Sequence, residues 1–220
     1  MRPTLPDPAR ALLCVPTPQE RERLERLAPD VMDADRWLAV ETIGFGPIAA
    51  AARVAGLLAA HAPERVVLVG VAGGDPELLP VGTATAFGEV VLDGVGAGES
   101  FAALLPSGMG LPQWHGDDRE AVEERLALAD EGPRLLTVCS ASEGTTMIEA
   151  RRARFPDVAA EDMEGFGVAL AAHFGRVPAH VVRGISNAVG DRDHARWRVD
   201  DGLRAAAELL RAALEGGDGR

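Results

Sequence analysis

Positive charge is scarce in this chain of 220 residues, which carries 22 basic and 34 acidic side chains and a formal net charge of −12. This balance argues against a nucleic acid or an anionic membrane as a partner. A small anionic substrate is compatible with it, because such a substrate needs only a local basic group. No apolar run approaches the roughly 18 residues of a membrane-spanning helix, and no signal-peptide pattern begins the chain. We therefore expect a cytoplasmic protein.

Cysteine is almost absent. Cys14 and Cys139 are the two in the chain, and both lie in apolar runs typical of strands. Buried, reduced thiols are the simplest interpretation, ahead of a disulfide or a metal pair. The five histidines show neither the spacing of metal ligands nor a partner for a catalytic triad. The sequence therefore predicts no metal and no cofactor.

Ala, Val and Leu are abundant instead, which suits close packing of helices on a sheet. The chain is long enough for one α/β domain and short for two, and no linker or repeat divides it, so we expect a single domain over residues 1–220. Apolar segments read as strands alternate with helical patterns. Strands are expected at 11–15, 65–71, 81–92, 134–139 and 179–184, and helices at 19–27, 48–61, 119–130 and 200–214. This order predicts a three-layer α/β/α fold with a mixed, partly barrel-like central sheet.

Residues 161–193 hold most of the polar side chains that point to chemistry. Glu161 and Asp162 precede an apolar-periodic run, and acidic side chains are favoured at a helix N-terminus, so we expect them to open a helix. Gly175 suits the left-handed residue that ends a helix, and Pro178 follows as a stop.

The next segment, 179–184, reads as a strand covered on both faces. Its end delivers Arg183, Ser186 and Asn187 to the carboxyl edge of the sheet, where open α/β folds bind ligands. Arg183 lies inside an apolar strand and must have a partner if it is buried. We expect an ion pair with Glu164 or with another carboxylate.

These motifs resemble a known family. The sequence MEG at 163–165, followed by VRGISN at 182–187, is similar to the nucleoside phosphorylase and nucleosidase family. The continuation VGDRD at 189–193, with Trp197 soon after, is most similar to its futalosine hydrolase branch. The resemblance extends more weakly over residues 12–210. It implies a homo-oligomeric enzyme of menaquinone biosynthesis that uses water to cleave futalosine into hypoxanthine and dehypoxanthine futalosine.

The resemblance also assigns roles. Glu164 stands where the family keeps the carboxylate that binds the ribose hydroxyls, and Met163 would pack against the sugar. Glu20 stands where the family keeps the general base that activates the attacking water. Without the resemblance, Glu164 would be read as an acidic residue at a helix N-terminus, and Glu20 as a solvated charge on the helix 19–27.

Asn187 holds the position where adenine-specific nucleosidases of the family carry an Asp. Its amide NH₂ offers two donors, which match the adjacent N7 and O6 acceptors of hypoxanthine. An ionised carboxylate would be repelled by the same edge. Asn187 therefore favours a 6-oxopurine, although an amide can also pair with adenine, and a loop Asn that bonds its own backbone is the plainer alternative.

Three further positions bear on the substrate. Gly73 lies at a glycine-rich strand end, where a ligand can approach the backbone, as under the ribose in the family. Phosphorolytic relatives carry an Arg two residues before the strand's Gly70, to hold phosphate. Leu68 stands there in this chain, which favours water as the nucleophile. Arg192 or Arg196 could meet the benzoate of futalosine, and a surface charge is an equally good interpretation of both.

Other functions remain open from the sequence. A methylthioadenosine/adenosylhomocysteine or aminofutalosine nucleosidase is the first alternative, and Asn187 counts against it. A purine nucleoside phosphorylase is the second, with Leu68 against it. A nucleoside-binding protein without catalysis is the third, and the combination of Glu20, Glu164 and Asn187 counts against it.

A dinucleotide site at Gly44-Phe45-Gly46 is disfavoured. Ala49 stands where the third glycine of that motif would be, and no acidic residue ends the next strand. We expect a structural turn before the helix 48–61.

Overall fold

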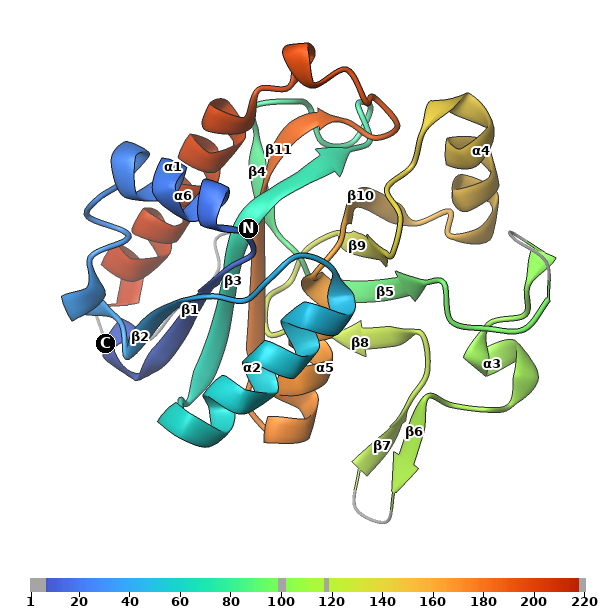
Figure 1. Cartoon of the computed structure of the whole chain (residues 1–220), viewed down its shortest axis with the longest axis horizontal. Helices are drawn as coiled ribbons and strands as arrows, with labels where there is room; N and C mark the ends of the chain where they lie inside the picture. Colours follow the sequence, from blue (N-terminus) through green and yellow to red (C-terminus); the bar gives the residue numbers. More distant parts are fainter. Residues whose placement is uncertain (1–6, 99–101, 117–118, 218–220) are drawn as a thin grey trace.

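The computed structural model describes residues 7–98, 102–116 and 119–217. Among these residues, nine strands form one mixed sheet, and helices cover both of its faces (Figure 1). The predicted three-layer α/β/α fold is confirmed.

One half of the sheet is parallel. β1 (Ala11–Val15) lies between β2 (Ala39–Thr42) and β3 (Arg65–Gly74). β11 (Ala179–Ala188) pairs with β3 along its other edge. The sequence-predicted strands are present, except that the segment 81–92 forms two short strands, at 84–86 and from 89 onward. β3 and β11 run several residues further than expected, to the edge where ligands are bound in such folds.

The other half continues from the end of β3. There β10 (Val158–Asp162) pairs with β3 in antiparallel orientation, and β9 (Arg134–Val138) and β5 (Glu89–Asp93) follow in parallel to β10. β8 (Arg125–Ala127) joins β5 at the outer edge.

The sheet also closes on itself. β4 (Ala84–Ala86) pairs with β11, and the chain passes through only two residues before it becomes β5. Pairing links β3, β10, β9 and β5 on one side and β3, β11 and β4 on the other, and the chain at residues 87–88 joins β4 to β5, as expected for a partly barrel-like sheet.

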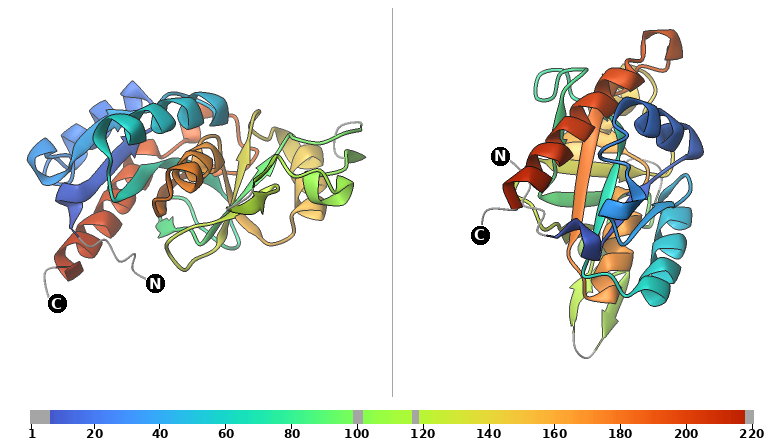
Figure 2. Two further views of the ribbon diagram at one scale, coloured as in Figure 1. Left: turned by 90° about the horizontal axis from the view of Figure 1, so that it is seen from below. Right: turned by 90° about the vertical axis from the view of Figure 1, so that its left-hand side faces the viewer.

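Two pairs of helices form the outer layers (Figure 2). α1 (Pro18–Leu27) and α6 (Val199–Gly217) pack together on one face, and α2 (Pro47–His61) and α5 (Gly165–Gly175) on the other. No helix in the described part of the chain is long and apolar enough to cross a bilayer. The described residues also form α3 (Pro106–Met109), α4 (Gly144–Arg154) and short 3-10 turns at Pro8–Arg10, Ala34–Arg36 and His194–Arg196.

Alternation along the central strands assigns side chains to the two layers. In β1, Leu12 and Cys14 belong to the apolar cluster under α2 and α5, whereas Leu13 and Val15 belong to the cluster under α1 and α6. All four side chains are fully buried, as expected for a strand covered on both faces.

The predicted helix at 119–130 is wrong. β7 (Arg119–Val122) forms a hairpin with β6 (Trp114–Gly116), seen at the lower right of Figure 1, and β8 follows it. Val122, Glu124 and Leu126 are buried in alternation with exposed neighbours, which is the period of a strand. The buried Glu124 carboxylate accepts hydrogen bonds from Ser107, so an acidic side chain occupies an inward position and hides the pattern.

The cysteine prediction holds for one residue. Cys14 is buried in β1, but Cys139 is exposed. β9 ends at Val138, one residue earlier than the apolar run suggests, so Cys139 lies in the loop that follows.

Candidate functional site

A cavity of about 310 Å³ opens where the ends of β3, β10 and β11 meet the start of α1. Six of the residues that the sequence analysis selected for the site line it, whereas Arg183 and Arg196 do not. The six are Glu20, Gly73, Met163, Glu164, Asn187 and Arg192. Residues far apart in the chain are therefore brought to one place, around a volume suited to a small molecule.

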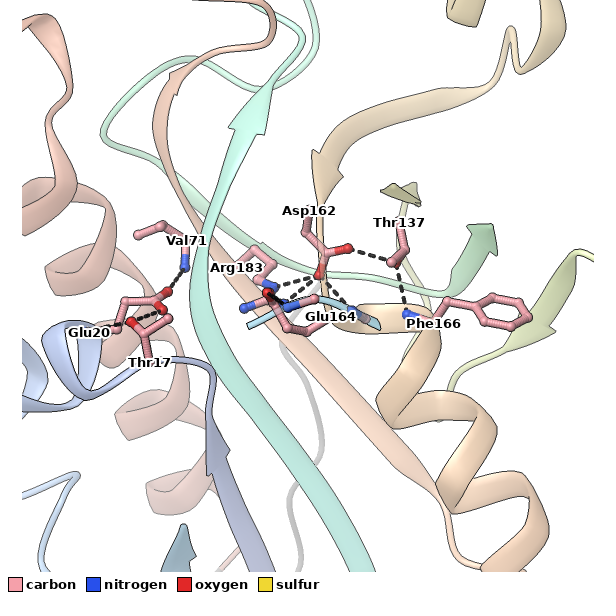
Figure 3. Close-up of polar contacts among 10 residues, drawn as sticks. Thr17, Glu20, Val71, Thr137, Asp162, Glu164, Phe166 and Arg183 are labelled. Atoms are coloured by element: carbon pink, nitrogen blue, oxygen red, sulfur yellow. Dashed lines mark hydrogen bonds and ion pairs between the residues drawn. The ribbon is translucent and has the colours of Figure 1, made fainter. Parts of the chain in front are cut away.

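The strand β10 ends with the acidic residues that were expected to open a helix. Glu161 and Asp162 are in β10, and α5 begins only at Gly165, so that expectation is wrong. The Asp162 carboxylate accepts hydrogen bonds from Thr137 Oγ1 (2.7 Å) and from Gly165 N (2.8 Å), as Figure 3 shows. Thr137 Oγ1 in turn accepts the Phe166 N–H at 2.8 Å. These bonds satisfy the first free N–H groups of α5 from the strands below it.

Arg183 lies behind this turn with its side chain completely buried. Its guanidinium donates to Asp162 through both Nε and Nη2, and Nη2 also donates to Glu164 Oε2 at 3.1 Å. The predicted ion pair is confirmed, with two carboxylates instead of one. Burial alone would lower the pKa of Arg183, but the negative charges of Asp162 and Glu164 raise it above its ordinary value, so this residue stays charged.

Glu164 is held from two sides. Its Oε2 accepts from Arg183, and its Oε1 accepts the N–H of Gly46 at 3.0 Å. Gly44 and Gly46 have positive φ angles of 93° and 88°, so the expected structural turn is present. The same turn positions Glu164, a contact that the sequence analysis missed.

The environment of Glu164 disfavours its charge. Burial raises its pKa to about 7, and the charges of Asp162 and Glu20 act in the same direction. Arg183 and the Gly46 N–H oppose this shift. The ionised carboxylate, which Arg183 stabilises, therefore gains population only as the pH rises through about 7.

This shift predicts a pH-dependent stability. The folded-state pKa of about 7 lies above the ordinary 4.5, so the folded protein holds the Glu164 proton more tightly than the unfolded chain. The resulting stabilisation is complete below pH ~4.5 and is lost as the pH rises through ~7. Relative to Glu164→Gln, which does not titrate there, the wild-type free energy of unfolding should fall by about 3 kcal/mol across this window. Urea unfolding of both proteins at several pH values measures it, and a constant difference between them would contradict the prediction.

Glu20 lies on the other side of the β3 ribbon from Glu164 and Arg183 (Figure 3). It lies in the first turn of α1, which Thr17 caps by accepting the Glu20 N–H at 3.2 Å. The Glu20 side chain turns inward: Oε1 accepts the Val71 N–H at 3.0 Å, and Oε2 accepts the Thr17 hydroxyl at 2.7 Å. Glu20 is therefore not a solvated helix charge.

Gly70 makes this approach possible. A Cβ at Gly70 would lie 2.7 Å from Glu20 Oε1, and closer still to Nη1 of Arg183. A larger residue in the middle of β3 would separate Glu20 from Arg183. An interior strand glycine often marks such a close approach.

Asn187 is the last residue but one of β11, and its amide is hydrogen-bonded to the loop that follows. Oδ1 accepts the Ser186 hydroxyl at 2.8 Å, while Nδ2 donates to Ala188 O at 2.9 Å and to Asp191 O at 3.4 Å. Trp197 Nε1 donates to the same Asp191 carbonyl at 3.0 Å. The Asn187 amide lines the cavity and also holds the loop at residues 188–191 by hydrogen bonds.

Arg192 supplies a positive charge at the exposed side of the cavity. Its guanidinium stacks on the Trp197 ring, 4.9 Å from the centroid, and forms no ion pair with a carboxylate within the described part of the chain, although the charge of the neighbouring Asp191 acts on it. Arg196, the other sequence candidate, is bound to Asp191 and Asp193 and does not line the cavity.

The side chains that line the cavity indicate which chemistry it can support. Two carboxylates from different elements, Glu20 and Glu164, face one volume with an amide beside them. Such a set can hold hydroxyl groups, accept a proton from water and stabilise developing positive charge.

Comparison with known proteins agrees with a site that supports this chemistry. A model of the phosphorylase superfamily matches residues 36–216. The futalosine hydrolase of Streptomyces coelicolor is 34% identical over 181 residues, which cover 76% of this chain and 74% of that protein. The 5′-methylthioadenosine/S-adenosylhomocysteine nucleosidase of a Marinomonas species is 30% identical over 173 residues, 75% of this chain and 73% of that protein.

The fold is shared as well. The crystal structure of the Neisseria meningitidis 5′-methylthioadenosine/S-adenosylhomocysteine nucleosidase, in complex with methylthio-immucillin-A, matches with a TM-score of 0.74 at 16% identity. The match covers 94% of this chain and 98% of that chain. The chain therefore belongs to the phosphorylase superfamily, among its nucleosidases, which are N-glycosyl hydrolases.

Proposed function

We propose that this nucleosidase is a futalosine hydrolase, which cleaves the N-ribosidic bond of futalosine with water and releases hypoxanthine and dehypoxanthine futalosine. The observation that carries the proposal is that Glu20, Glu164 and Asn187 line one cavity. The similarity to the Streptomyces coelicolor futalosine hydrolase supports it. The second candidate is a methylthioadenosine/adenosylhomocysteine nucleosidase, which the Marinomonas relative favours.

The ribose binds to Glu164 in this proposal. The carboxylate accepts the 2′- and 3′-hydroxyl protons, which orients the sugar and places a negative charge near the cation that develops as the base departs. Met163, the preceding residue, also lines the cavity and packs against the sugar.

Glu20 prepares the attacking water. Its carboxylate accepts the proton of a water molecule that approaches the anomeric carbon, as a general base. The Val71 N–H and the Thr17 hydroxyl hold the carboxylate in place. A base fixed by two hydrogen bonds loses little conformational freedom when the substrate arrives.

Asn187 binds the departing purine. The amide NH₂ donates to N7 and O6 of hypoxanthine while Gly73 keeps the backbone close beneath the ligand. Binding requires Nδ2 to exchange its present bonds, and the 3.4 Å bond to Asp191 O is long enough to be weak. The leaving base takes its proton from water, because an amide has no acidic proton to give.

Water is the nucleophile instead of phosphate. The position of the phosphate-binding arginine in phosphorolytic relatives is held by Leu68, which is fully buried in the core. Among the cavity-lining residues, Arg192 and His194 are the basic ones, and both are exposed, away from the reaction centre. Arg183 is already ion-paired with Asp162 and Glu164, so a phosphate dianion beside Glu20 and Glu164 would have no free cation to offset their repulsion.

Arg192 binds the acidic end of the substrate. The benzoate of futalosine needs a cation at the open end of the cavity, where Arg192 forms no ion pair in the described residues and the nearby Asp191 is itself ion-paired with Arg196. Stacking on Trp197 orients the guanidinium without neutralising it.

The decisive assay follows base release from futalosine, inosine and methylthioadenosine, each with and without phosphate. The proposal expects the highest kcat/KM for futalosine, hypoxanthine as the product, and no dependence on phosphate. Arg192→Gln should raise KM for futalosine about tenfold and leave inosine unchanged, because a charged hydrogen bond contributes roughly 1.5–3 kcal/mol. A preference for methylthioadenosine would favour the second candidate, and a requirement for phosphate would exclude hydrolysis.

A homo-oligomer is part of the proposal. Phe45 lines the cavity although 67% of its surface is exposed, and Ile48 beside it is 82% exposed. Apolar side chains at the mouth of a site suit cover by a neighbouring subunit.

A further inference from the structure

The carbonyl groups that bind the Asn187 amide each have a second donor. Nδ2 of Asn187 donates to two carbonyl oxygens, Ala188 O at 2.9 Å and Asp191 O at 3.4 Å. The Ala188 carbonyl also accepts the Asp191 N–H at 3.1 Å, and the Asp191 carbonyl also accepts the Trp197 indole N–H at 3.0 Å. Both oxygens therefore keep one hydrogen bond after Nδ2 has left them.

The oxygen of the amide has a partner with an alternative too. Oδ1 accepts the Ser186 hydroxyl at 2.8 Å, and the same hydroxyl lies 3.3 Å from a second acceptor, Ala72 O. A buried polar group that loses all its hydrogen bonds is costly, so an amide whose partners had no alternatives would resist exchange. The second partners around Asn187 lower that cost.

Trp197 is held by contacts that do not involve the amide. Its backbone N–H donates to His194 O at 3.3 Å, and its ring lies 4.3 Å from the His194 ring between centroids. The next residue, Arg198, donates its N–H to Ser186 O at 2.7 Å. These contacts keep the indole beside the Asp191 carbonyl whether or not the amide binds the same oxygen.

We propose that Trp197 is a positioning residue whose indole N–H keeps the Asp191 carbonyl hydrogen-bonded while the Asn187 amide turns to the ligand. The inference rests on the proposed function, in which Nδ2 must leave both carbonyl oxygens. A carbonyl oxygen has two lone pairs, and that of Asp191 holds two donors in the free site. One donor remains when the site is filled, and Trp197 supplies it without touching the base.

Loss of the indole N–H changes this balance. In Trp197→Phe, a ligand that takes Nδ2 would leave the part-buried Asp191 carbonyl without a hydrogen bond from the described residues. The loss of one typical hydrogen bond corresponds to a roughly three- to tenfold change in an equilibrium constant. Phenylalanine keeps an aromatic ring for Arg192 to stack on, so the variant isolates the effect of the N–H group.

Calorimetry with hypoxanthine tests the inference without relying on catalysis. We expect Trp197→Phe to weaken hypoxanthine binding about three- to tenfold. Trp37→Phe is the matched control, because the Trp37 indole donates to Val31 O at 2.7 Å in the apolar cluster under α1 and α6. The control removes the same kind of bond away from the cavity and should change the affinity by less than about twofold. Equal losses in the two variants would overturn the inference.

The Asn187→Ala background separates positioning from packing. Alanine has no amide to exchange, so adding Trp197→Phe to this background should change the hypoxanthine affinity by less than about twofold. A loss as large as in the wild-type background would show that Trp197 acts by packing, and the inference would fail.

The NMR signal of the Trp197 indole proton gives a second readout, which needs no ligand in the Asn187→Ala variant. A carbonyl that has lost one donor binds the other more strongly. We therefore expect this proton to shift downfield in free Asn187→Ala, and in wild type when hypoxanthine is added. An indole signal that moves in neither case would contradict the inference.

Failure of this inference can be told apart from failure of the proposed reaction. If the effect of Trp197→Phe depends on Asn187 but futalosine is not cleaved, the positioning role stands and the proposed reaction fails. If futalosine is cleaved and Trp197→Phe binds hypoxanthine as tightly as wild type does, the reaction stands and this inference fails.

Discussion

Replacing Glu164 with glutamine should give a folded protein whose turnover is lower by about 10²–10³-fold, the usual effect of removing a group that stabilises transition-state charge. The amide can still accept the Gly46 N–H, so the turn around it should persist. In the proposed reaction, what is lost is the negative charge beside the ribose and one of the two acceptors for its hydroxyls. Steady-state kinetics with futalosine measures the loss, and thermal unfolding verifies the fold.

Glu25→Gln is a suitable control for this experiment. Glu25 is an exposed residue of α1 that pairs with Arg21, so its replacement should leave turnover unchanged. Near-normal turnover of Glu164→Gln would remove Glu164 from the reaction, whatever the behaviour of the control.

Arg183→Met should reduce the free energy of unfolding by about 3–5 kcal/mol, because it leaves buried carboxylates without their cation. Asp162 and Glu164 both depend on this guanidinium, and the Arg183 side chain has no exposure to water that could compensate. Equilibrium unfolding in urea measures the change.

The control for Arg183 is an arginine in a surface ion pair. Arg26 pairs with Asp200 at 2.7 Å and its side chain is 60% exposed, so Arg26→Met should cost under ~1 kcal/mol. A loss of similar size in both variants would show that burial of the Arg183 pair has no special effect. Restoration of part of the stability by Asp162→Asn in the Arg183→Met background would support the electrostatic explanation.

Apolar runs and turn residues were sufficient to predict the central strands. Segments 65–71 and 179–184 are apolar on both faces, and a strand covered on both sides has few other ways to satisfy such a sequence. The buried Arg183 was informative for the opposite reason: a charge inside an apolar strand requires a partner, and carboxylates were correctly expected.

The errors have a common physical cause. Glu161 and Asp162 resemble a helix N-terminus in the sequence, but Arg151 and Arg183 hold their carboxylates inside the sheet. Glu124 hides a strand in the same way. Contacts between residues distant in the chain decide whether each of these segments forms a helix or a strand, and the local sequence pattern does not reveal those contacts.

The contact of the Gly46 amide with Glu164 and the position of Glu161 at the cavity were missed for a related reason. Gly46 contacts Glu164 across 118 positions of the chain, and its sequence context indicates only a turn. The position of Glu161 beside Gly73 follows from the antiparallel pairing of β10 with β3, in a half of the sheet whose strand order the sequence does not reveal.

The charges around the cavity are distributed unevenly along its depth. Glu20, Glu161 and Glu164 surround the inner part, while Arg192 lies at the exposed end. A ligand with one neutral end and one anionic end can therefore enter in a single direction, with the neutral ring first and the anion trailing towards the guanidinium. In the proposed reaction, the same polarity would favour outward release of the acidic product fragment once the bond to the ring is broken.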